Sequence, residues 1–222
     1  DCAGSPGFKP DDAASHSFVF DNAERTLITV RLKDQTEYIF RDEFGQFTMK
    51  LMQIKDKNGN TISYNYDTLG KLITIVDRAN HQLTIGYNAQ NLISEISDWT
   101  GRSVQYGYDA QGNLTSVEDP NNNITTYAYD ENFKLTSITD REGKKVIVNV
   151  FTPEAKLATQ TDAANLTKAY TYNESQKTIT IADTLGRSQE TSYDDKARIL
   201  AEKDTLQKSI TYTYGTEFSP LT

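Results

Sequence analysis

The chain has 222 residues, of which 36% are hydrophobic and 24% charged, and its formal net charge is -8. This acidic balance, without any cluster of Lys and Arg, excludes nucleic acid or an anionic membrane surface as an expected partner, because phosphate binding needs concentrated positive charge. No apolar run approaches the roughly 18 residues of a membrane-spanning helix, so we expect no membrane insertion.

The first part of the chain does not share the rhythm of the rest. Residues 1–26 predict an irregular leader, because "DCAGSPGFKPDDAASH" is rich in turn-forming residues. The sole cysteine, Cys2, cannot form an internal disulfide, and whether it is a lipidation site stays open. Residues 27–50 predict lead-in cap strands, and Asp42-Glu43-Phe44-Gly45 already shows the turn signature of the later sequence.

Residues 51–222 carry a sequence repeat with a 21-residue period, interrupted by one step that is longer by a single residue. An aromatic residue recurs in every copy: Tyr66, Tyr87, Tyr108, Tyr129, Phe151, Tyr172, Tyr193 and Tyr214. An Asp recurs in the same way: Asp56, Asp77, Asp98, Asp119, Asp140, Asp162, Asp183 and Asp204. Self-similarity at a fixed period indicates stacked structural units, so the eight copies are interpreted as structure and not as eight active sites.

Turn signals divide each repeat in two. Further turns start at Asp67, Asn88, Asp109, Asp130, Thr152, Asn173, Asp194 and Gly215, so that reversals follow one another every 10 to 12 residues. An Asp at the first turn position accepts backbone hydrogen bonds, and a Gly three residues later tolerates a positive φ. The glycines at this place are Gly59, Gly70, Gly101, Gly112, Gly143 and Gly186.

The segments between the turns are short and rich in Thr, Ile, Val and Tyr, which is typical of β-strands. Short turns between sequential strands require antiparallel neighbours. The sequence therefore predicts an all-β fold: one continuous domain, an antiparallel β-hairpin meander of about fifteen or more strands that curls into an open spiral or partial shell. Equivalent tyrosines are expected to stack as a ladder on one face. A β-propeller is the alternative, since two repeats supply the four strands of one blade.

Tyr-Asp-x-x-Gly at 66–70 and 108–112, together with Leu-x-x-Ile-x-Asp at 135–140, resembles the YD repeat of the Rhs family. Related repeats occur in bacterial Rhs and polymorphic toxins, in the B and C subunits of insecticidal toxin complexes and in teneurins. The resemblance implies a secreted or cell-surface bacterial protein whose sheet forms part of a shell around a C-terminal toxin. The Asp-Pro-x-Gly motif of autoproteolytic family members is not found in this sequence.

The resemblance also sets the expected partners. These are the rest of the shell or a C-terminal toxin cargo that this chain does not contain. An extracellular adhesion module that binds a cell-surface glycan or protein is the alternative function.

No catalytic, cofactor-binding or metal-binding constellation emerges from the sequence. The carboxylates occupy equivalent turn positions, and equivalent environments do not separate two pKa values as an acid-base pair requires. We therefore expect a protein that is not an enzyme and that needs no cofactor or metal. The one candidate ligand contact is Trp99, whose indole could stack on a sugar or could fold over the adjacent hairpin.

Overall fold

The computed structural model describes residues 16–20, 26–42, 48–214 and 220–221. The chain divides into two compact units, residues 1–106 and 107–222, and each is described by itself. Several expectations fall outside the described residues: the leader up to residue 15 with Cys2, the turn at Glu43-Phe44-Gly45, and Gly215.

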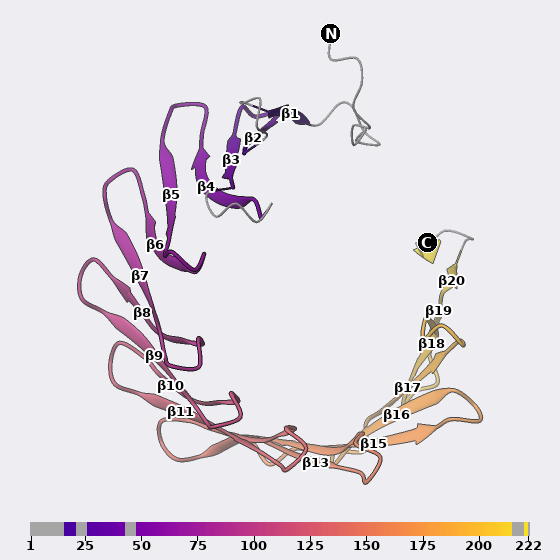
Figure 1. Cartoon of the computed structure of the whole chain (residues 1–222). Helices are drawn as coiled ribbons and strands as arrows, with labels where there is room; N and C mark the ends of the chain where they lie inside the picture. Colours follow the sequence, from indigo (N-terminus) through magenta and orange to yellow (C-terminus); the bar gives the residue numbers. More distant parts are fainter. Residues whose placement is uncertain (1–15, 21–25, 43–47, 215–219, 222) are drawn as a thin grey trace. The chain divides into compact units, whose positions relative to one another are not determined.

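Unit 1 is an antiparallel meander in which each strand pairs with the next one in sequence, as Figure 1 shows. Its strands are β1 (His16–Phe20), β2 (Leu27–Leu32), β3 (Glu37–Arg41), β4 (Lys50–Lys55), β5 (Thr61–Tyr66), β6 (Leu72–Val76), β7 (Gln82–Tyr87), β8 (Ile93–Asp98) and β9 (Ser103–Tyr108), the last of which crosses the unit boundary. Residues 16–20 of the expected leader thus form a strand.

Unit 2 continues the same pattern of neighbouring antiparallel pairs. Its strands are β10 (Leu114–Glu118), β11 (Ile124–Tyr129), β12 (Leu135–Thr139), β13 (Lys145–Phe151), β14 (Leu157–Asp162), β15 (Thr167–Asn173), β16 (Thr178–Asp183), β17 (Ser188–Tyr193), β18 (Ile199–Asp204) and β19 (Ser209–Thr211). A small separate pair, β20 (Thr213–Tyr214) and β21 (Pro220–Leu221), follows.

The all-β antiparallel meander predicted from the turn spacing is confirmed, and the sheet is open. In neither unit does the first strand pair with the last among the described residues. The propeller alternative is wrong, because each meander runs on past the four strands of a blade without a break in the neighbour pairing. No helix that could span a membrane occurs in the described part of the chain. The division into leader, cap and repeat sheet stays a prediction.

The two faces of the sheet differ in chemistry. Directly opposed residues share a face, and in unit 1 the pairs Ile54 with Ile62 and Ile85 with Ile96 define an apolar face. The other face carries mostly polar residues, as in the pair Thr84 with Ser97. Ile85, at 8% exposure, is the one buried apolar residue among the described residues. The sheet is therefore a single layer without the core that a second layer would create.

In an antiparallel meander, successive turns lie at opposite edges of the sheet. We call edge A the one with the turns that start at Asp56, Asp77, Asp98, Asp119, Asp140, Asp162, Asp183 and Asp204. Edge B has the turns that start at Asp67, Asn88, Asp109, Asp130, Thr152, Asn173 and Asp194. Each repeat aromatic lies at the edge B end of its strand.

Candidate functional site: the two turn edges

The turn at Asp56 shows the geometry that the repeats share. The Asp56 amide donates to the Asn60 carbonyl at 2.9 Å, and the Gly59 amide donates to the Asp56 carbonyl at 3.0 Å. The Asp56 Oδ1 accepts the amides of Asn58 and Asn60, both at 2.8 Å. This is a three-residue hairpin loop whose last residue is left-handed, with φ 79° at Gly59. The carboxylate thus satisfies backbone donors that the ladder cannot reach.

The same backbone pair closes all but one of the turns from 56 to 208, and the Asp or Asn oxygen accepts two amides in most of them. The six turn glycines predicted from the sequence all have a positive φ: Gly59, Gly70, Gly101, Gly112, Gly143 and Gly186. Where the sequence has no glycine, another residue takes the left-handed conformation: Asn80, Asn91, Asn122, Phe133, Ala155, Asn165, Ala197 and Gln207. The turn at Asn173 differs, with Lys177 as its left-handed residue.

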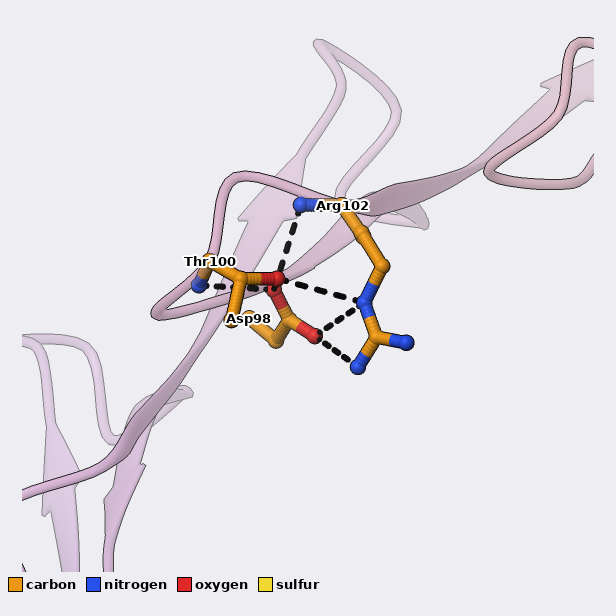
Figure 2. A network of polar contacts seen from close by, with 3 residues as sticks. All are labelled: Asp98, Thr100 and Arg102. Carbon is orange, nitrogen blue, oxygen red and sulfur yellow. Dashed lines mark hydrogen bonds and ion pairs between the residues drawn. The ribbon is translucent and has the colours of Figure 1, made fainter.

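The turn at Asp98 has the densest polar network (Figure 2). Its Oδ1 accepts the Thr100 amide at 2.9 Å and the Thr100 hydroxyl at 2.6 Å, and its Oδ2 accepts Nε and Nη2 of Arg102 at 2.8 and 2.6 Å. The hydrogen bond from the Thr100 hydroxyl and those from Arg102 hold the pKa of Asp98 far below its ordinary value. Such a carboxylate stays ionised and has no proton to donate in catalysis.

The strand ladders alternate in length. From β4 onward, most pairs joined by an edge A turn have three ladder positions: β4 and β5 pair only from Gln53 with Ser63 to Lys55 with Thr61. Pairs joined by an edge B turn have four to six, as in β5 with β6 and β15 with β16. The edge B ends of β4 and β5 therefore part, and the carbonyl of Leu51 lies beyond the ladder.

The repeat tyrosines fill these gaps. The Tyr66 hydroxyl donates to the Leu51 carbonyl at 2.9 Å, and the pKa of Tyr66 is raised by burial, which keeps the phenol a donor. The equivalent bonds run from Tyr87 to Leu72 at 2.8 Å, Tyr129 to Leu114 at 2.9 Å, Tyr172 to Leu157 at 3.0 Å and Tyr214 to Ile199 at 2.7 Å. Each spans 15 residues of sequence, so the repeat aromatic closes the place where the backbone ladder has ended.

Two copies depart from this rule for visible reasons. Phe151 has no hydroxyl, and the side-chain amide of Asn149 donates to the Leu135 carbonyl instead, at 2.9 Å. At Tyr193 the preceding ladder is longer: β16 and β17 pair at five positions, as far as Thr178 with Ser192, and the Tyr193 amide donates to the Lys177 carbonyl. A gap that the backbone closes needs no phenol.

The expected stacking of equivalent tyrosines on one another is wrong. Equivalent rings are two strands apart, which is about 10 Å, whereas stacked rings need centroids about 4.5–7 Å apart. A cation lies over the ring instead: Lys50 on Tyr66 at 5.8 Å, Lys71 on Tyr87 at 5.0 Å, Lys134 on Phe151 at 5.6 Å, Lys156 on Tyr172 at 5.0 Å and Arg198 on Tyr214 at 4.8 Å from the centroid.

Sequence reasoning missed these cations although a signal was present. A Lys or Arg recurs in the same register as the aromatics, at Lys50, Lys71, Lys134, Lys156, Lys177 and Arg198. Each precedes the aromatic of its repeat by nearly the same interval, as Lys50 precedes Tyr66. The periodicity could have been found by testing every residue type, and not only the turn formers and aromatics, for the repeat.

Turns on the same edge also contact one another through a fixed pair of positions. The residue directly after the first turn residue contacts the residue that directly follows the previous turn on that edge. On edge A, the guanidinium of Arg78, which follows Asp77, donates to Asn60. On edge B, Glu174, which follows Asn173, forms an ion pair with Lys156. Trp99 obeys this rule, because its ring stacks on that of His81 with centroids 4.1 Å apart and an angle of 17°.

The indole of Trp99 is 55% exposed, and its contact with a ligand stays a prediction. Within residues 16–20, 26–42, 48–214 and 220–221, no group of three or more His, Cys, Asp or Glu side chains could hold a metal ion. The predicted Asp residues thus lie in the turns, and most of the predicted tyrosines lie at the gaps between strands.

The comparisons with known proteins agree with this geometry. Residues 87–124 and 108–145 match the family described as RHS Repeat. Residues 87–145 are RHS repeats. The resemblance to the Rhs family is thereby confirmed, and the Asp and aromatic register of these RHS repeats extends from Asp56 to Tyr214. A search of curated protein sequences finds no match.

Solved structures with a similar fold include several of TcdB2-TccC3. The chain is similar to the crystal structure of TcdB2-TccC3-Cdc42, with a TM-score of 0.61, 11% identity, and coverage of 94% of this chain and 14% of that one. For TcdB2-TccC3 without its hypervariable C-terminal region the TM-score is 0.59 at 10% identity, covering 90% of this chain and 15% of that one. For TcdB2-TccC3 the values are 0.55 and 10%, with 89% and 15% covered. The chain thus spans about one seventh of the length of these proteins.

Proposed function

We propose that this chain is a non-catalytic segment of RHS repeats that forms part of the wall of a shell around a toxin cargo, in a secreted bacterial protein. The observation that carries the proposal is the single-layer antiparallel meander, built from RHS repeats and shared with the TcdB2-TccC3 structures. One of these structures is described as lacking a hypervariable C-terminal region, which fits a wall whose contents vary.

The physics of the sheet suits a wall. Because the ladder, the turns and the phenol bonds stabilise it without a second layer, both faces remain available, one to the inside and one to the outside. The two faces also differ: apolar pairs such as Tyr127 with Ile138 lie on one, and pairs such as Ala128 with Ser137 on the other. A barrier of this kind acts by excluding proteases and bulk solvent and requires no reactive group.

Co-expression of the complete shell that contains this chain with the polypeptide encoded next to it tests the proposal, because this chain alone spans only about one seventh of the similar proteins. Limited proteolysis by proteinase K should leave that polypeptide intact while the shell stands and should degrade it once the shell is opened with denaturant. The matched control is the same polypeptide expressed alone, which should be cleaved at once. Equal cleavage of that polypeptide with and without the complete shell would contradict the enclosure role.

A further inference from the structure

An open hollow of about 480 Å³ lies on edge B of unit 2, between the turn that starts at Asp109 and the turn that starts at Asp130. The side chains around it that matter for its chemistry are Asn113, Tyr127, Tyr129, Glu131 and Phe133. They combine aromatic rings with carboxylate oxygen.

Other repeats show what occupies the same place elsewhere in the chain. In the repeat that starts two copies later, the ammonium of Lys156 lies 5.0 Å from the ring centroid of Tyr172 and forms an ion pair with Glu174. The side chain of Glu174 is 69% exposed, and the hydrogen bond from Lys156 lowers its pKa. One cation thus joins an aromatic ring and a carboxylate at the gap between two turns.

The sequence spacing of this trio recurs at the hollow. Tyr129 and Glu131 follow Asn113 at the same two intervals at which Tyr172 and Glu174 follow Lys156. The copy after Lys156 keeps the ion pair as well, since Lys177 contacts Asp195 across the same sequence separation. The hollow therefore has the ring and the carboxylate of the trio, with Asn where the cation stands in the other repeat.

The side chain of Asn113 does not replace the missing cation. Its Nδ2 donates to the Oδ2 of Asp109 at 2.8 Å, which holds it against its own turn. Lys134, the cation of the adjacent turn, lies over Phe151 at 5.6 Å. In the part of the chain that the structure describes, no Lys or Arg lies over the ring of Tyr129.

We propose that this hollow binds a primary ammonium group, held over the ring of Tyr129 and against the carboxylate of Glu131. The ammonium would occupy the position that Lys156 fills between Tyr172 and Glu174. Cation-π attraction and a carboxylate together select a cation over a neutral group of the same size. This site is independent of the enclosure role, because it is inferred only from a comparison of the repeats with one another.

Titration of the 222-residue chain with n-butylammonium chloride, followed by amide ¹H-¹⁵N shifts, tests the site. We expect saturable shifts at Tyr129 and Glu131 that neither n-butanol nor matched sodium chloride produces. Asn113→Lys supplies the repeat's own cation and should weaken binding at least tenfold, and Glu131→Gln should weaken it several-fold. Asn123→Lys is the matched control, because Asn123 donates to Asp119 at 2.9 Å in the same manner but on edge A.

Folding of each variant is checked by circular dichroism, and Asn113→Lys should also raise the thermal midpoint more than Asn123→Lys does. Equal shifts with n-butanol, or unchanged binding by Asn113→Lys, would overturn the proposal. Two further ligands identify the source of the ammonium. A peptide with one Lys that binds better than its norleucine counterpart and better than n-butylammonium assigns the site to a partner polypeptide, whereas tighter binding of a linear polyamine assigns it to a free amine.

Discussion

Replacing Tyr66 by Phe removes one hydroxyl and leaves the ring in place, which isolates the hydrogen bond that closes the gap between β4 and β5. The carbonyl of Leu51 then loses the donor that stands 2.9 Å away, and no ladder amide can take its place because the pairing stops at Gln53 with Ser63. A part-buried carbonyl without its donor raises the free energy of the folded state.

The expected loss of unfolding free energy is about 1 kcal/mol, the net value of one such hydrogen bond. For a chain of this size that corresponds to a decrease of roughly 2–4 °C in the thermal midpoint. Circular dichroism measures the midpoint, and amide hydrogen exchange in β4 and β5 locates the effect, since a repeat sheet opens locally. Faster exchange should be confined to these strands and their immediate neighbours.

Two natural exceptions in the same chain supply the controls. Tyr193→Phe should cost less, because the backbone ladder already reaches Thr178 at that gap. Asn149→Ala should cost more than Tyr66→Phe, because the Asn149 amide is the donor to the Leu135 carbonyl beside Phe151 and its Oδ1 also accepts a hydrogen bond from Gln160 at 3.0 Å. If Tyr193→Phe destabilises the chain as much as Tyr66→Phe does, the phenol contributes through its own polarity and not by closing the gap.

Three further outcomes are expected. Gly143→Ala should lower the unfolding free energy by about 1 kcal/mol, because φ is 77° there; the added Cβ meets nothing within 4 Å, so the cost comes from the backbone conformation alone. Ala155→Gly, at φ 70°, should have the opposite effect and raise the midpoint of unfolding in urea. Hydrogen bonds from the Arg198 amide and guanidinium lower the pKa of Asp194 to about 2. The contribution of Asp194 to stability should therefore be complete above about pH 4 and lost as pH falls toward 2, which acid unfolding measures. Lys156→Met should destabilise the chain at low ionic strength and have little effect in 1 M salt, as thermal scans at both salt concentrations would show.

The turns and strands could be predicted from the sequence because their cause is local. An Asp needs only the next four residues to accept its hydrogen bonds, as Asp56 does from the amides of Asn58 and Asn60. This requirement appears in the sequence as an Asp that recurs at the start of most turns. The positive φ of Gly59 and Gly143 follows from the same few residues. Strand length is then set by subtraction, and the antiparallel direction by the shortness of the turns.

The role of the repeat aromatic could not be predicted, because it depends on where the ladder stops. The partner of Tyr66 lies 15 residues away, and the bond exists only because β4 and β5 separate before reaching Leu51. Stacking of equivalent tyrosines was predicted from contacts between neighbouring strands, whereas these rings lie on every second strand and are separated by two strand spacings. The exception at Tyr193 arises from the longer ladder between β16 and β17, which the sequence register does not reveal.

Without a core, the sheet must be stabilised by contacts between adjacent hairpins. Each repeat contributes turn bonds, a ladder, a phenol bond and a cation over a ring, and most of these link a strand to its neighbour. The energetic consequences of a substitution should therefore remain near its own repeat and add to those of distant repeats, unlike core substitutions in a globular domain. The combined variant Tyr66→Phe and Tyr172→Phe is expected to lose the sum of the two single losses, measured as unfolding free energies. A large coupling between these hydroxyls, which belong to different units, would show that the repeats do not act as independent neighbours.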